Sequence, residues 1–362
     1  MSRPNTNRRA PAPALAAAIF ATTISVAGTA NAAEPPQAPA PIGVFGADMP
    51  AKGKLVVTLS PSFTRMQGVK IGDQWVKAPY IVTTVPSAYT PIGLHTLRMV
   101  PHALSTDTQA LSLAYGLSNN VTLFASTGLV EKSVDMEAFK GLSGTTPLGY
   151  KVGSTSSVAD TTLATVVRLH QDKVNRFNVN LGLSLPTASD TEDISLLLPN
   201  GTAPAKRAFY AMQPGTGTVD ALAGAAYSGV SGPWSWGASY RARLPLGDNP
   251  QGWRYGDLHE ANAWGGYALA SGIEATLRLN GAVQGAIHGQ DPLIRGYAQG
   301  ANPNFNGGQQ LSLFAGAVVS GQRFGLKAFQ FGAEAGAPLY QQLNGPQLAR
   351  AWQVNLAIRY RR

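Results

Sequence analysis

Short segments in which apolar and polar residues alternate recur along nearly the whole chain from residue 53 onward. Clear examples are RFNVNLGLSL (176–185) and AWQVNLAIRY (351–360), where every second side chain is apolar. Successive side chains of a β-strand point to opposite faces, so each segment predicts a strand with one apolar and one polar face. By this rule the sequence predicts about twelve strands.

The connections between these segments alternate in length. Tight turns are predicted at SNN (118–120), QDKVN (171–175), SGPW (231–234), SG (271–272) and GQRFG (321–325). Longer connections are predicted over 67–107, 132–156, 188–215, 247–257, 289–308 and 338–348. Bacterial outer-membrane barrels have short periplasmic turns and longer outer loops, whereas a Greek-key sandwich has no reason for such a rhythm. The sequence therefore predicts an all-β, up-and-down antiparallel transmembrane β-barrel in the cell outer membrane, with both termini periplasmic.

The polar faces of the predicted strands carry charges near the middle of the strands. In a membrane barrel the apolar face meets lipid, and these charges point into the lumen. A soluble barrel would reverse the two faces; the even strand number and the loop rhythm favour lipid. The candidate lumen-lining residues are Arg168, Arg241, Arg243, Glu260, Arg278, Glu334 and Arg359.

The N-terminus predicts export. Arg3, Arg8 and Arg9 precede an uncharged stretch, and Ala30-Asn31-Ala32 forms an A-x-A cleavage site. The predicted plan is a signal peptide (1–32), a flexible Pro/Ala-rich segment (33–52) and the barrel (53–362).

Composition narrows the chemistry. The chain has no Cys, so disulfides and thiolate metal or redox sites are excluded. Without the three signal arginines, the net charge of +9 falls to +6, and this spread, moderate charge predicts no nucleic-acid partner. No cofactor and no metal are expected. The expected partners are outer-membrane lipids and lipopolysaccharide, the barrel-insertion machinery, and a small-molecule substrate.

Several stretches resemble the outer-membrane barrels called "MetA-pathway of phenol degradation", a family of putative-transporter type. The most specific are MQPGTGTVD (212–220), WSWGASYRARLPLGDNPQGWRYGD (234–257), NFNGGQQLSLFAG (304–316) and PLYQQLNGPQL (338–348). The resemblance implies an outer-membrane barrel for passage of small, including aromatic, compounds. The chain departs from the family in FYAMQ, which has Ala211, and in a first region with few Met and His residues.

The lumen is the best candidate for function. One interpretation is a selective constriction, because rings of charge set the selectivity of a pore. The other is a sealed lumen filled by Arg–Glu pairs. The predicted function is an outer-membrane channel or passive transporter for small molecules, with aromatic and anionic compounds as candidates and no enzymatic activity.

Two alternatives stay open. One is a non-conducting structural or surface-binding barrel. The other is an outer-membrane enzyme acting on lipid, which would need a Ser–His pair such as Ser239 and His259. The acidic turn Asp190, Glu192 and Asp193 is expected to be a solvated loop rather than a Ca²⁺ site, because it lacks the spacing of a calcium loop.

Overall fold

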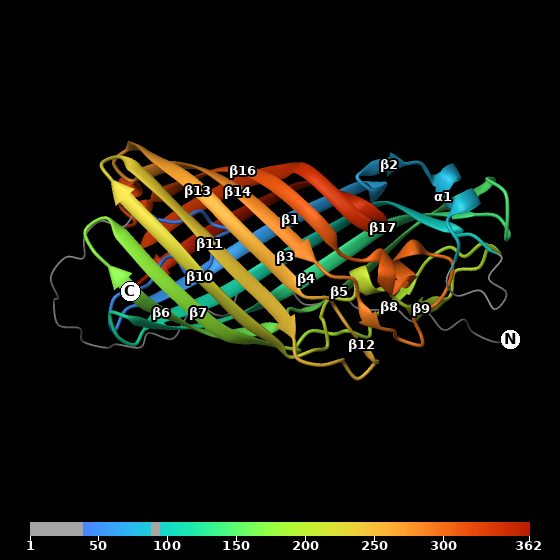
Figure 1. Cartoon of the computed structure of the whole chain (residues 1–362), viewed down its shortest axis with the longest axis horizontal. Helices are drawn as coiled ribbons and strands as arrows, with labels where there is room; N and C mark the ends of the chain where they lie inside the picture. The colour runs from blue at the N-terminus through green and yellow to red at the C-terminus, as the bar shows by residue number, and fades with distance from the viewer. Residues whose placement is uncertain (1–38, 88–94) are drawn as a thin grey trace, which may run out of the picture. The chain divides into compact units, whose positions relative to one another are not determined.

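A computed structural model describes residues 39–87 and 95–362. The predicted signal peptide and residues 33–38 lie outside these ranges. The chain forms an antiparallel barrel in which almost every strand pairs with its neighbour in the sequence (Figure 1). The ring strands are β1 (Leu55–Gly72), β3 (Met99–Gly116), β4 (Val121–Phe139), β6 (Thr161–Gln171), β7 (Asn175–Leu185), β10 (Asp220–Ser231), β11 (Trp234–Pro245), β13 (Leu258–Ala270), β14 (Ile273–Gln284), β16 (Gly308–Ser320) and β17 (Phe329–Arg361).

Pairing of β17 with β1 closes the ring. The long β17 crosses the barrel twice, because its residues 330–343 pair with β16 and its residues 347–361 pair with β1. The reversal lies at Asn344-Gly345, where Gly345 has φ 78°, a left-handed conformation that glycine adopts without strain. Eleven labelled strands thus make twelve crossings. The predicted all-β up-and-down barrel is confirmed.

The outward face of the barrel is apolar and the inward face is polar. Buried polar side chains on the strands include Asn178, Asn180, Ser184, Asn280 and Asn355. Large apolar side chains stay exposed on the outside, among them Leu59, Leu111, Leu113, Leu123, Leu163, Leu181, Leu183, Leu277, Leu279, Leu313, Leu356 and Ile358. Since soluble proteins rarely expose a continuous apolar surface, this arrangement requires lipid around the barrel.

Three long strands at the start of the barrel correct the predicted connections. β1 extends to Gly72, β3 begins at Met99, and β4 ends at Phe139, so much of the predicted loops 67–107 and 132–156 is strand. β5 (Pro147–Val158) continues the line of β6 along β4. The predicted connection 338–348 is in the right place but is shorter than expected, because strand pairing continues to residue 343 and resumes at residue 347.

In the outer part of β4, the alternation of outward apolar and inward polar residues fails for a physical reason. Beyond Leu129 on β4, the inward residues Val134, Met136 and Ala138 are apolar and fully buried, while Glu131 and Asp135 lie on the outward face. The polarity of the two faces is therefore reversed relative to the lower part of the strand. Above the membrane the outside meets water and the inside meets a protein core, so the reversal is what the two solvents require.

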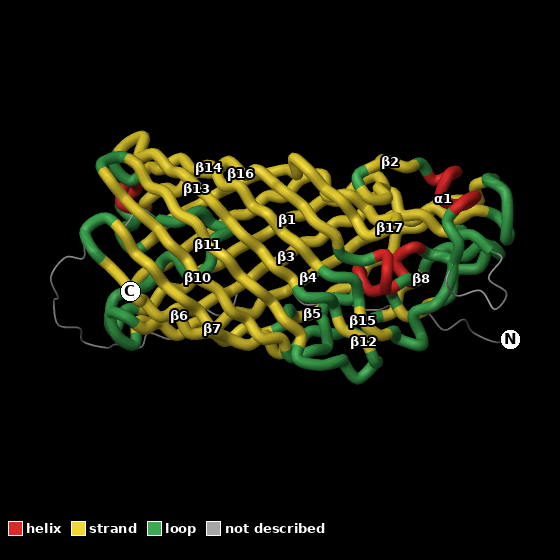
Figure 2. The backbone as a smooth tube through the Cα atoms, viewed as in Figure 1, coloured by secondary structure: helices red, strands yellow, loops and turns green. Residues whose placement is uncertain are grey.

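The remaining elements gather at the end of the barrel opposite the C-terminus (Figure 2). They are β2 (Gln74–Val76), α1 (Ala78–Thr84), β8 (Asp193–Ser195), β9 (Ala205–Arg207), η1 (Tyr210–Met212), β12 (Trp253–Arg254), β15 (His288–Gly289), η2 (Gln299–Ala301) and η3 (Pro303–Phe305); η4 (Gly321–Phe324) lies in a short turn instead. By the rule of short periplasmic turns, the loop-rich end is the outer end. No helix among the described residues is long and apolar enough to cross a membrane.

Candidate functional site

The seven charged residues predicted to line the lumen lie on the inward face, and most are paired. Arg278 Nη2 lies 2.5 Å from Glu334 Oε1, and both side chains are buried. Arg241 Nε donates to Glu260 Oε2 at 3.1 Å. Arg243 pairs with Asp220, and its Nη2 lies 3.4 Å from Asp160 Oδ2. Two further members, Arg359 and Arg168, lie nearer the periplasmic end, the first 3.2 Å from Asp48 and the second buried.

Residues 39–50, which precede β1, run through the lumen. The carbonyl oxygens of Gly46 and Ala47 accept hydrogen bonds from Asn178 Nδ2 on β7. Phe45 packs edge-on against Phe124 on β4, with ring centroids 4.8 Å apart. The same segment packs against Trp264 on β13 and Ala226 on β10. Contacts with strands all around the ring are possible only from inside, so this segment fills the periplasmic half of the lumen.

A polar cavity of about 350 Å³ lies above this segment. Ile42, Gly43 and Phe45 form its floor, and inward residues of the surrounding strands form its wall. A Cβ added at Gly43 would meet the Arg278 and Glu334 side chains. Glycine thus lets the N-terminal segment approach the ion pair closely.

Arg350 also lines this cavity, and alternation alone did not identify it. Trp352 faces outward, so strict alternation would point Arg350 into lipid as well. The register of β17 against β1 shifts between the pairs Arg65–Trp352 and Met66–Arg350, which leaves Ala351 as an extra residue. This β-bulge turns Arg350 to the inward face.

A group of loop residues, called the lid below, packs over the outer end of the barrel (Figure 2). Its core is a buried apolar cluster that contains Met136, Tyr210, Met212, Trp253 and Ile294, together with neighbours from β3 and β8. The hydroxyl of Tyr255 donates to the Tyr210 carbonyl oxygen at 2.7 Å, and burial raises the pKa of this phenol. The lid is therefore a packed structure with its own core.

Two strand side chains hold the lid segment around η1. Lys132 Nζ donates to the carbonyl oxygens of Ala211 at 3.0 Å and Gln213 at 2.7 Å. Thr155 Oγ1 donates to the Met212 carbonyl oxygen at 2.6 Å. Three successive carbonyl groups of the FYAMQ stretch are thus bound by the barrel wall, including that of the atypical Ala211.

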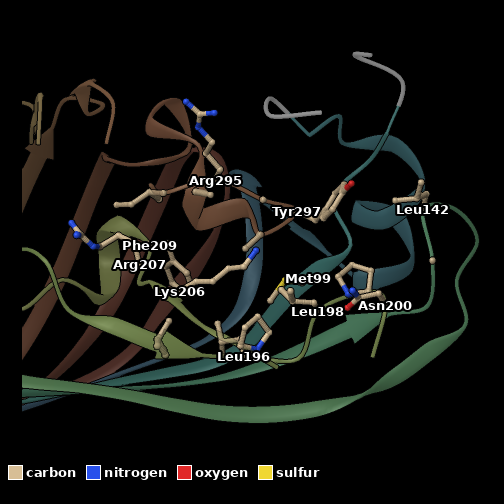
Figure 3. Close-up of a pocket in the computed structure, with 18 residues that line it drawn as sticks. Met99, Leu142, Leu196, Leu198, Asn200, Lys206, Arg207, Phe209, Arg295 and Tyr297 are labelled. Carbon is tan, nitrogen blue, oxygen red and sulfur yellow. The ribbon is translucent and has the colours of Figure 1, made fainter. Parts of the chain in front are cut away.

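A second cavity, of about 440 Å³, lies among the outer loops (Figure 3). Its walls are mainly apolar and include Met99, Leu196, Leu198, Phe209 and Ile294. This size and lining are typical of a site for a small organic molecule, for which roughly 300–1,000 Å³ is usual.

Cationic side chains border the same cavity. Lys206 extends along its wall, whereas Arg295 points away from it (Figure 3). The remaining cation, Arg207, is bound to Asp291, with Nη1 and Oδ2 3.0 Å apart. On the far side, Arg98 donates to five backbone carbonyl oxygens, four of which belong to residues 140, 141, 143 and 144. The loop that carries the wall residue Leu142 is therefore fixed in place.

The Ser239–His259 pair considered for lipid hydrolysis is not formed. Ser239 faces the lumen, where it accepts a hydrogen bond from Asn262 Nδ2 at 3.2 Å. His259 lies on the outward face, with Nδ1 2.7 Å from the Tyr240 hydroxyl oxygen. Side chains on opposite faces of a sheet cannot share a proton, so these two residues form no catalytic dyad.

The acidic turn contributes to loop structure. Asp190 Oδ2 accepts a hydrogen bond from Asn249 Nδ2 at 3.1 Å, and burial raises the pKa of this carboxyl group. Asp193 lies 3.8 Å from Arg207. Within residues 39–87 and 95–362, no cluster of three or more His, Asp or Glu side chains could hold a metal ion.

Comparison with known proteins supports the fold. No family model matches the sequence, and no curated protein matches it, so the resemblance to the MetA-pathway family is not confirmed by sequence. A solved structure described as the COG4313 outer membrane channel from Pseudomonas putida F1 has a TM-score of 0.55 and 15% identity, over 88% of this chain and 98% of that one. The toluene transporters TodX of Pseudomonas putida and TbuX of Ralstonia pickettii are also similar, at TM-scores of 0.38 and 0.39 and identities of 10% and 11%.

The structural alignment with TodX covers 85% of this chain and 89% of TodX, and the alignment with TbuX covers 86% of this chain and 90% of TbuX. The first structure shows a shared barrel fold. Together with the apolar exterior and the up-and-down topology, this fold makes the chain an outer-membrane β-barrel.

Proposed function

We propose that the protein is a channel that takes small, largely apolar molecules, aromatic compounds among them, across the outer membrane. The observation that supports this most is the apolar cavity of about 440 Å³ among the outer loops. An apolar pocket facing the outside would collect such molecules from dilute solution, because burial of apolar surface is favourable by roughly 25 cal/mol per Å². Lys206 at its wall would favour an anionic or polarised group on the molecule.

The route inward needs movement. The outer cavity shares wall residues such as Leu196, Phe209 and Ile294 with the core of the lid, and residues 39–50 occupy the lumen at the periplasmic end. A molecule would pass the lid, enter the central cavity of about 350 Å³, and leave when the N-terminal segment shifts. The N-terminal segment is held by hydrogen bonds, one ion pair and a small apolar cluster, which open locally at lower cost than the barrel strands. The lid has the larger core, so its opening is the costlier step.

Uptake by cells tests the proposal. Leu196→Trp would fill the outer cavity, whereas Leu326→Trp at the periplasmic end adds the same side chain away from it. In cells lacking their own copy, uptake of labelled phenol should rise with the wild type and with Leu326→Trp, and stay at background with Leu196→Trp. Equal uptake with and without the wild-type protein would reject the channel and favour a non-conducting structural barrel.

A further inference from the structure

We propose that the central cavity is a binding site for a small carboxylate with an apolar body, and that Arg350 is the counter-ion of that carboxylate. This inference rests on the proposed function, because it names the class of molecule that the lumen would hold between the lid and the N-terminal segment. The outer cavity, by contrast, is mainly apolar and would select for the body of the molecule.

The charges around the central cavity do not balance. Its charged lining residues are Arg241, Glu260, Arg278 and Arg350; Glu334 lies behind the wall as the partner of Arg278. Two of the arginines are each paired with one of the two glutamates. The third, Arg350, forms no ion pair within 4.0 Å among the described residues, and the one carboxylate that acts on it from further away, Glu260, already pairs with Arg241. The three arginines therefore share two carboxylates, and one positive charge is in excess.

Arg350 is also short of hydrogen-bond acceptors. Its Nε is buried and has no acceptor in the described part of the chain. Buried donors are nearly always paired in folded proteins, so an unpaired buried Nε–H in a cavity wall indicates an acceptor that arrives from outside the chain. The planar fork of an arginine fits the two oxygens of a carboxylate better than any other single side chain.

The backbone is built to place this charge in the lumen. The bulge at Ala351 turns Arg350 toward the lumen, whereas regular alternation would have pointed this charged side chain outward into lipid. The hydrogen bonds between Gln341 and the Arg350 backbone, at 2.9 and 3.1 Å, hold the bulge across the hairpin of β17. The backbone of Arg350 is therefore fixed in a position from which its side chain reaches the cavity.

The rest of the wall indicates the body of the molecule. Phe45 and Phe314 present aromatic rings, and Ile42 and Ala110 add aliphatic surface. Arg278 already covers one face of Phe314, with 4.1 Å from its guanidinium carbon to the ring centroid. Neutral hydroxyl and amide groups, such as those of Ser62 and Asn280, complete the lining. An aromatic or short aliphatic monocarboxylate satisfies both the charge and the apolar surface.

Calorimetric titration of the refolded mature barrel in detergent tests this site. The probes are benzoate and benzamide, which have nearly the same shape and differ in charge. The variants are Arg350→Met, which removes the charge, and Ala110→Trp, which fills the cavity and leaves every arginine in place. Arg323→Met, in the periplasmic turn, is the matched control. Heat-modifiable migration on a gel establishes that each variant is folded.

Wild type and Arg323→Met should bind benzoate at least about tenfold more tightly than benzamide. Arg350→Met should weaken benzoate by about tenfold to a hundredfold and leave benzamide unchanged, as the loss of a hydrogen bond to a charged group implies. Ala110→Trp should abolish binding of both probes at this site.

Equal affinities for benzoate and benzamide in the wild type, or equal benzoate affinity in wild type and Arg350→Met, would overturn the inference. The Leu196→Trp variant distinguishes failure of the carboxylate site from failure of the proposed channel function. If benzoate still binds to that variant through Arg350 while uptake fails, the site is real and the outer cavity is needed for entry. If uptake depends on Leu196 but charge makes no difference to binding, the channel stands and the carboxylate site falls.

Discussion

Removal of the Glu334 carboxylate should destabilise the barrel far more than removal of an exposed carboxylate in the same kind of ion pair. The Arg278–Glu334 pair is almost fully buried, with side chains 4% and 2% exposed, and its closest atoms are 2.5 Å apart. Asn355 Nδ2 donates to Glu334 at 2.8 Å, and Asn262 Oδ1 accepts from Arg278 at 2.7 Å. The pair is thus the centre of a buried polar network that joins β13, β14 and β17.

The expected magnitude follows from desolvation. Glu334→Ala leaves the Arg278 guanidinium buried without a counter-ion, which typically costs about 3–5 kcal/mol. The matched control is Asp248→Ala, because the Arg254–Asp248 pair also has a 2.5 Å contact but its side chains are 35% and 47% exposed. Such an exposed pair contributes about 0–1 kcal/mol. The double variant Arg278→Met/Glu334→Leu should be more stable than Glu334→Ala, since no unpaired charge remains.

Urea unfolding in lipid vesicles, followed by tryptophan fluorescence, measures these differences. The loss of unfolding free energy should be at least about 2 kcal/mol larger for Glu334→Ala than for Asp248→Ala, which is the gap between the two ranges above. Equal losses would refute this expectation, because they would mean that water reaches Arg278 and solvates its unpaired charge.

Two further predictions concern the outer end. Lys132→Met should leave the carbonyl groups of Ala211 and Gln213 without donors, which costs about 1–3 kcal/mol each, and should therefore speed hydrogen exchange over 208–216. The control is Lys151→Met, which loses only a hydrogen bond to Ser195. Equal exchange rates in the two variants would contradict the role of Lys132. Arg98→Lys should loosen the loop 140–146, because an ammonium group has three donors, whereas the guanidinium group now donates to five carbonyl oxygens. Hydrogen exchange of that loop is the measurement, and unchanged protection would show that Arg98 is dispensable.

The part of the barrel inside the membrane could be predicted from the sequence because a single rule holds there. On strands such as β7, lipid outside and a polar lumen inside enforce strict alternation, so the strand centres and tight turns were predicted correctly. The upper parts of β3 and β4 obey the opposite rule, so a search for outward apolar residues missed them. In the sequence, these upper parts are recognisable as segments in which the two-residue alternation continues but polar residues take the outward positions and apolar residues the inward positions.

Two parts of the site depend on features that alternation does not encode. Arg350 reaches the lumen only through the bulge at Ala351, and a one-residue shift reverses every side chain beyond it. The path of residues 39–50 through the barrel depends on contacts with strands far apart in the sequence, such as those of Asn178 and Arg359. Pairing of Arg278 with Glu334 rests on the neighbouring strands β14, β16 and β17, and could be inferred only once the order of strands was known.

The reversal of polarity on β4 also sets the height of the outer cavity. The change falls between Leu129 and Glu131, and the strand continues to Phe139. With a rise of about 3.3 Å per residue and a tilt of about 40°, these residues lift the end of the strand roughly 20 Å above the hydrocarbon boundary. At that elevation the wall is surrounded by the aqueous side of the membrane rather than by acyl chains. In the proposed channel, a molecule arriving at Leu196 and Phe209 would therefore be captured from the water layer above the membrane, so the protein would spare it the crossing of the leaflet beneath.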